Sequence, residues 1–146
     1  MSEAFTIPIP TITLIIITVI PIAISTVLII TLALPVITLK IEVFQDRIEV
    51  WALPLYKFSA KRSDVVEVFI ADLKVRIDIT PVSRLYGHGL PSYAVGWFKL
   101  RNGAKAFLAV SSNNAVVFKL RDETYLVLTP MNMESFIGAL KRMGWL

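Results

Sequence analysis

The chain has 146 residues, of which 55% are hydrophobic, and a formal net charge of +4. This length allows one small domain beside a long apolar segment and excludes two full domains. The absence of cysteine excludes disulfides and thiolate metal sites, and no nucleic-acid recognition motif accompanies the modest positive charge, so we expect no nucleic acid among the partners.

An uncharged stretch near the N-terminus is the strongest signal in the sequence. No Asp, Glu, Lys or Arg occurs from Ala4 to Leu39, and a charge at the centre of a bilayer costs about 2.5–3.5 kcal/mol. Within this stretch, Thr11–Leu34 would form a helix roughly 36 Å long, which is enough to cross a hydrocarbon core of about 30 Å. We therefore predict a lead-in over residues 1–10 and a transmembrane helix over residues 11–35.

Two prolines are expected to shape this helix. Pro21 lies near its middle and predicts a kink, with the freed carbonyl bonded by the hydroxyl of Thr18 or Ser25. Pro35 predicts the end of the helix.

Two alternatives to a single span remain open. A signal peptide could be cleaved near the small residues of Ala23–Ser25, although no basic residue precedes the apolar run and the run continues beyond them. A helical hairpin could turn at Pro21, although each arm would be too short to cross a bilayer.

Basic residues follow the apolar segment, and none precedes it. Lys40, Arg47 and Lys57 come after it, and the positive-inside rule places such residues in the cytoplasm. We therefore expect a single-pass membrane protein with its N-terminus outside and residues 36–146 in the cytoplasm.

From Val36 onward the pattern changes to short β-rich runs separated by turn signals, which is typical of an all-β unit. Ile37–Phe44 and Arg47–Leu53 alternate apolar and charged residues around a short turn and predict a hairpin. Pro54 interrupts the second run and indicates an edge or a bend. Val75–Thr80 also alternates, either as an extension of the preceding strand or as a separate one. The other predicted strands are Leu55–Phe58, Val65–Leu73, Ala94–Leu100, Ala104–Val110, Ala115–Leu120 and Thr124–Leu128.

The longest stretch without periodicity is Pro81–Tyr93, which predicts a loop. It contains Gly87-His88-Gly89, and His88 is the only histidine of the chain. A single histidine without cysteine partners cannot form a metal cage, so we interpret His88 as a turn residue between glycines that adopt positive φ. We expect no metal and no cofactor.

The C-terminal segment has helical periodicity. Phe136, Ile137 and Leu140 share one face, Asn132 is a suitable N-cap, and Gly144 suits the C-terminal stop. We predict an amphipathic helix over residues 132–143 that covers an apolar surface of the β-unit.

About seven antiparallel strands in two packed sheets, capped by one C-terminal helix, resemble a pleckstrin-homology-like (PH-like) domain. The chain is similar to prokaryotic PH-domain families, which are often tethered to membranes and mostly lack an assigned function. Thr129 stands where those families usually have Ser, and Met131–Met133 replaces a more acidic start of the helix. The resemblance covers Ile37–Leu146, and the residues that carry it are Arg84, Gly87, Gly89, Pro91, Tyr93, Gly96, Phe98, Asn102, Gly103, Tyr125–Pro130, Phe136 and Leu140.

The sequence offers no arrangement that is typical of catalysis. Its acidic residues are scattered, and no serine has a nucleophile-elbow context, so we do not expect an enzyme. Trp97 is expected to pack in a sheet, and Trp145 is the freer candidate for a surface contact. Basic residues gather at two predicted turns, where they could attract anionic lipid or be ordinary solvated strand ends; they are Lys57, Lys61 and Arg62, and Lys99, Arg101 and Lys105.

Two interpretations of function follow. The first is a non-enzymatic scaffold that binds a protein partner or its own copies through an exposed sheet edge, such as a strand bent at Pro54. The second is a module that binds anionic lipid headgroups through the basic turns. A domain that is already tethered to a membrane gains little from weak lipid affinity except orientation. The sequence therefore favours the scaffold, with the bilayer and an unidentified protein or a second copy as partners.

Overall fold

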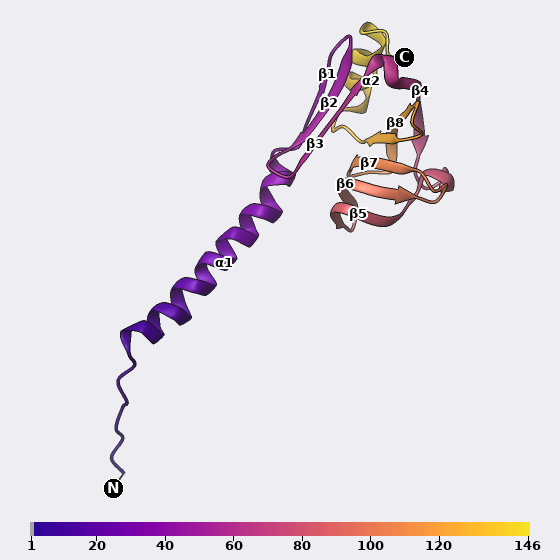
Figure 1. Ribbon diagram of the computed structural model, residues 1–146. Coiled ribbons are helices and arrows are strands. Elements are labelled where there is room, and N and C mark those ends of the chain that lie inside the picture. Colours follow the sequence, from indigo (N-terminus) through magenta and orange to yellow (C-terminus); the bar gives the residue numbers. More distant parts are fainter. Residues whose placement is uncertain (1) are drawn as a thin grey trace.

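The computed structural model describes residues 2–146, which form a long helix and a β domain at its C-terminal end (Figure 1). Helix α1 (Thr11–Ile37) extends away from the domain, and its apolar side chains are exposed along its length. Among the described residues, α1 alone is long and apolar enough to cross a membrane.

Helix α1 continues past Pro35, which the sequence predicted as its end. Pro35 is buried, and the last turn is held by Thr38, whose backbone N–H donates to the carbonyl oxygen of Leu34 at 2.9 Å. The hydroxyl of Thr18 donates to the carbonyl oxygen of Leu14 at 2.6 Å, so it does not bond the carbonyl that Pro21 frees. The kink at Pro21 stays a prediction.

The connection between helix and domain consists of Thr38 and Leu39. The hydroxyl oxygen of Thr38 lies 2.6 Å from the carbonyl oxygen of Leu34 and 2.8 Å from that of Leu53, so its proton is shared between helix and domain. This short connection therefore keeps the domain next to the end of α1.

The first sheet is antiparallel and contains β1 (Lys40–Val43), β2 (Arg47–Ala52) and β3 (Tyr56–Lys61), in that order. Pro54 lies in the turn between β2 and β3, and β2 is the central strand. The bend predicted at Pro54 is confirmed, because the chain turns there, whereas the alternative of an edge strand before Pro54 is wrong, because the free edges of this sheet belong to β1 and β3.

The second sheet has six strands in the order β4-β8-β9-β7-β6-β5. All neighbours are antiparallel except β7 and β9, which are parallel. Asn102-Gly103 connects β6 to β7, as predicted. The strands are β4 (Val65–Asp72), β5 (Pro81–Leu90), β6 (Tyr93–Leu100), β7 (Lys105–Val110), β8 (Asn114–Leu120) and β9 (Tyr125–Leu128).

The predicted fold class is confirmed, with two packed sheets and a C-terminal helix, although the described residues form nine strands where about seven were expected. Pro81–Tyr93, predicted as a loop, contains β5, whose register with β6 shifts near Pro81 and near Arg84. Val75–Thr80 is no strand. The chain turns directly after β4, where Asp72 Oδ1 accepts a hydrogen bond from the Lys74 N–H at 2.8 Å. It then forms the 3-10 turn η2 (Ile77–Ile79).

The core lies on both faces of the six-stranded sheet. Between the sheets, Phe58 and Phe107 stack at a centroid distance of 5.2 Å, and Trp97 packs edge-on against both, which confirms its predicted place. A second cluster on the other face includes Val117 and Val127 and is covered by Ile79 from the connection between β4 and β5.

Helix α2 (Met133–Arg142) confirms the predicted C-terminal helix. The side chain of Asn132 accepts the Ser135 N–H at 2.9 Å, and Leu140 is fully buried between the sheets. The prediction of a surface contact for Trp145 is wrong, since the residue is only 7% exposed and its Nε1 donates to the carbonyl oxygen of Phe44 at 2.8 Å. Its indole fills the end of the core beside Phe118.

Candidate functional site

The first predicted basic group is divided by the structure between two ends of β3. Lys57 lies near α1, where Trp51 and Lys40 are its neighbours across the sheet, whereas Lys61 pairs with Arg47 at the far end. Lys57 Nζ lies 4.0 Å from the centre of the Trp51 ring. The sequence predicted a turn after Phe58 that would bring Lys57 and Lys61 together. The chain instead continues as β3 up to Lys61, so the two lysines lie at opposite ends of one strand.

Arg62 has a structural role at the end of α2. Its guanidinium donates to the carbonyl oxygen of Met143 at 3.0 Å and to that of Gly144, and it lies over the Trp145 ring. Cations favour the C-terminal end of a helix, where carbonyl groups lack partners. Arg62 therefore holds the C-terminal segment against the domain.

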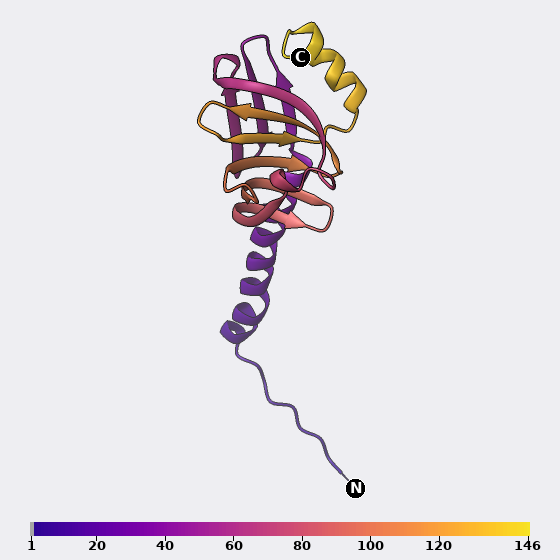
Figure 2. The same ribbon diagram turned by 90° about the vertical axis from the view of Figure 1, so that its right-hand side faces the viewer.

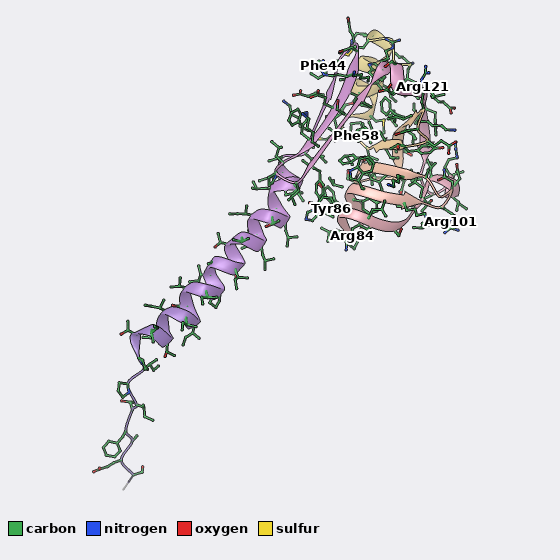
Figure 3. All side chains as sticks on the ribbon, in the orientation of Figure 1. Phe44, Phe58, Arg84, Tyr86, Arg101 and Arg121 are labelled. Atoms are coloured by element: carbon green, nitrogen blue, oxygen red, sulfur yellow. The ribbon has the colours of Figure 1, made fainter. Side chains whose placement is uncertain are left out.

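The second predicted basic group does lie together. Lys99 and Lys105 face each other across β6 and β7, and Arg101 lies in the turn between these strands. Figure 3 places Arg101 on the side of the domain remote from α1. The six basic residues thus occupy three separate places and form no common patch.

The predicted loop motif, Arg84, Gly87, His88 and Gly89, lies in β5. His88 Nδ1 is 2.8 Å from the hydroxyl oxygen of Tyr56 in β3, and Tyr56 also packs edge-on against Tyr86. Burial raises the pKa of the Tyr56 hydroxyl, the nearby Tyr86 adds to this, and Arg84 opposes it. His88 is therefore no turn residue but part of an aromatic link between the edge strands of the two sheets.

Glycine is needed in this part of β5 for a close approach to β6. Gly87 pairs with Gly96, and a Cβ on Gly87 would lie 2.4 Å from the carbonyl oxygen of Val95. Gly96 has φ of +121°, and a Cβ there would lie 2.4 Å from the carbonyl oxygen of Tyr86. The positive φ expected on both sides of His88 is found at Gly87 and not at Gly89.

A mostly apolar groove of about 680 Å³ opens beside the free edge of β1. Val36 at the end of α1 lies on one side, Phe136 of α2 on another, and Tyr93 and Val110 come from the six-stranded sheet. At one end of the groove, the Ser111 N–H donates to the Oγ1 of the buried Thr129 at 2.6 Å. The sequence did not reveal this groove because its walls come from segments that only the fold brings together.

A family model described as a bacterial PH domain matches residues 56–144.

The chain belongs to the bacterial PH domain family.

The match covers β3 to α2, so β1, β2 and α1 lie before the matched region of this PH-like domain. No curated protein and no solved structure matches the chain. PH domains of this family are typically non-catalytic. Within residues 2–146, no three His, Asp or Glu side chains are grouped closely enough to hold a metal ion.

Proposed function

We propose that the chain is a single-pass membrane protein whose PH-like domain is a non-enzymatic scaffold for another membrane protein. The groove beside β1 would bind an extended, apolar segment of that partner close to the bilayer. The observation that carries the proposal is the position of this groove, which is bounded by the last turn of α1 and by an unpaired strand edge.

The exposure of α1 supports its place in a membrane. Its most apolar part has no buried residue, and nothing else in the described chain covers it. So many exposed Ile, Leu and Val side chains would be strongly unfavourable in water. In lipid they are favourable, and a helix satisfies the backbone hydrogen bonds internally.

The free edge of β1 supports an extended partner. An unpaired strand edge can bind a further strand through backbone hydrogen bonds, while neighbouring pockets select its side chains. Strand β1 starts two residues after α1 and roughly continues its direction (Figure 1). A chain leaving the membrane beside α1 would therefore run along β1, with alternate side chains over Val36, Tyr93 and Phe136.

A different chain fits this edge better than a second copy. Two copies in one membrane would be related by a two-fold rotation axis along the bilayer normal. This rotation makes the two β1 strands parallel, but it also makes the two sheets face in opposite directions. Neighbouring strands in a continuous sheet do not have this relationship. The alternative function, headgroup binding by the basic turns, has less support because those residues are dispersed and Arg62 is engaged with α2.

Site-specific photo-cross-linking of the full-length chain in its native membranes tests the proposal. A cross-linker at Ser135, which lines the groove, is compared with one at Ser63, an exposed serine in the turn that follows β3. We expect Ser135 alone to form an adduct with an apolar segment next to a transmembrane helix of another protein.

Matched variants make the test specific for the groove. Met131→Arg, at the groove rim, should abolish the adduct, whereas Asn113→Arg, on an exposed turn outside the groove, should preserve it. Adducts with lipid alone, adducts between copies of this chain, or identical adducts from Ser63 would each contradict the proposal.

A further inference from the structure

Strand β5 is an edge strand with unusually exposed apolar side chains. It pairs with β6 alone, and its other edge is free. Leu85 and Tyr86 are 50% and 55% exposed, and Val82 and Leu90 are exposed as well. Such a surface indicates contact with a further apolar phase or partner.

The position of β5 beside the end of α1 indicates that this apolar phase is the bilayer that α1 is proposed to span. Figure 2 shows β5 as the strand of the six-stranded sheet that lies nearest to α1, at the end of the domain from which the helix leaves. Figure 3 places Arg84 and Tyr86 level with the C-terminal end of α1. Only Thr38 and Leu39 connect α1 to β1, and the Thr38 hydroxyl contacts the carbonyl oxygens of both Leu34 and Leu53, so β5 stays within a short distance of the plane in which the helix ends.

The charge of β5 also suits a lipid surface. Pro81–Leu90 contains Arg84 and no Asp or Glu, whereas the opposite edge strand β4 contains Glu67 and Asp72. Arginine is attracted to anionic headgroups, and tyrosine rings favour the boundary between headgroups and acyl chains. Tyr86 is held in place there by its edge-on contact with Tyr56.

We propose that β5 lies in the interfacial layer of the bilayer that α1 spans, with the apolar side chains of Leu85 and Tyr86 at the acyl boundary and Arg84 among the phosphates. The free backbone groups of β5 remain in the hydrated headgroup layer, since an open sheet edge is not stable in hydrocarbon. The bilayer thus covers an edge strand that would otherwise be open to pairing with other chains. This inference rests on the proposed place of α1 in the membrane.

Spin labels on single cysteines test the proposal directly, because the chain has no cysteine of its own. The full-length chain is placed singly in nanodiscs of phosphatidylcholine and phosphatidylglycerol, labelled through Leu85→Cys or through Ile70→Cys on β4. Ile70 is the matched control because it is 54% exposed on the opposite edge strand of the same sheet. Unfolding curves of both labelled chains should match that of the parent, and Val82→Cys replaces Leu85→Cys if that variant does not fold.

We expect the label at Leu85 to be accessible to oxygen, shielded from a water-soluble nickel chelate, and within about 5–10 Å of the boundary between headgroups and acyl chains. The label at Ile70 should be open to the nickel chelate. Equal access at both positions would overturn the proposal, as would shielding of Leu85 that requires two copies in one disc.

Two further variants test separately the role of Arg84 and the membrane position of α1. Arg84→Gln should move the Leu85 label toward water in anionic discs, whereas Arg101→Gln should leave it in place; the reverse result would overturn the role of Arg84. A label at Ile20→Cys reports on α1 itself. Shielding at Ile20 without shielding at Leu85 contradicts this inference alone, and an aqueous label at Ile20 contradicts the membrane anchor as well.

Discussion

The hydroxyl oxygen of Tyr56 lies 2.8 Å from Nδ1 of His88, and this hydrogen bond joins β3 to β5. These strands are the edges of two different sheets, so the bond closes the sandwich at the end nearest α1. Tyr86 packs against the same tyrosine ring. The only histidine of the chain therefore stabilises an inter-sheet contact.

Tyr56→Phe should lower the free energy of unfolding by about 0.5–1.5 kcal/mol, which is the usual net contribution of such a hydrogen bond. Tyr93→Phe is the control, because the Tyr93 hydroxyl is buried and has no hydrogen-bond partner within residues 2–146. Denaturant unfolding of the full-length chain in detergent, followed by tryptophan fluorescence, measures both. An equal loss in the two variants would contradict the role of the bond to His88.

The same substitution should change the dependence on pH. Burial raises the pKa of Tyr56 above its ordinary value of 10.0, so the folded protein holds this proton more tightly than the unfolded chain does. The contribution of the protonated Tyr56 hydroxyl to the free energy of unfolding is therefore complete below a pH of about 10. It is lost as the pH rises through the pKa of Tyr56 in the folded protein. Above that pH, the stability of Tyr56→Phe should fall less steeply than that of the parent.

Gly87→Ala should destabilise the domain by about 2 kcal/mol or more, because the new Cβ would collide with the backbone of β6. Gly89→Ala is the matched control, since the nearest atom to its Cβ is 3.7 Å away, on the Phe98 ring. We expect its effect to be within about 0.5 kcal/mol. Equal unfolding midpoints for the two variants would show that β5 and β6 are less closely paired than described.

Leu140→Ala should lower the free energy of unfolding by about 2–5 kcal/mol, because the Leu140 side chain of α2 is fully buried in the core and its truncation leaves a cavity there. Lys141→Ala, on the exposed side of the same helix, keeps the backbone and the capping unchanged. A loss below about half a kilocalorie for Leu140→Ala would mean that α2 is only loosely attached.

Arg62→Met should lower the free energy of unfolding by about 1 kcal/mol, because the carbonyl groups of Met143 and Gly144 lose their donor. Lys61→Met, on the exposed side of β3, should change it by less than about 0.5 kcal/mol. Thermal unfolding compares the two variants. If binding to anionic vesicles changed instead, with stability preserved, Arg62 would belong to a lipid site.

We expect the PH-like domain to lie in the cytoplasm, since Lys40 and Arg47 follow α1 and no basic residue precedes it. Protease added outside right-side-out vesicles should leave residues 40–146 intact. Two lysines added near Ser2 should give mixed or inverted insertion if this small charge difference sets the orientation. Digestion of the domain in the unaltered chain would reverse the predicted orientation.

The two helices could be predicted from the sequence because each has a simple, regular pattern of apolar residues. Helix α1 is uncharged and apolar on all sides, and α2 has one buried face, so absence of charge and a period of 3.6 residues were sufficient. Strand β5 was missed because it is exposed on both sides and therefore has no alternation, and its glycines suggested a turn. Val75–Thr80 alternates without being a strand, since Val75 and Ile77 are both exposed in an irregular connection.

The candidate site required three-dimensional information for a different reason. Lys57 and Lys61 are close in sequence, but an extended strand separates them toward opposite ends of the sheet. Val36, Tyr93 and Phe136 are far apart in sequence, yet they line one groove. Strand pairing decides both relationships, and single-sequence patterns do not determine which strands become neighbours.

The parallel pair β7 and β9 has a consequence for the order in which the domain can be completed. Strand β9 is made last but lies between β7 and β8, so it joins the meander of β5, β6 and β7 to the pair of β4 and β8. During synthesis, both groups of strands leave the ribosome with an unsatisfied inner edge until Tyr125–Leu128 is available. Because α1 precedes the domain in the chain, it leaves the ribosome while the six-stranded sheet is still in two unjoined parts, and only β9 and α2 complete the domain.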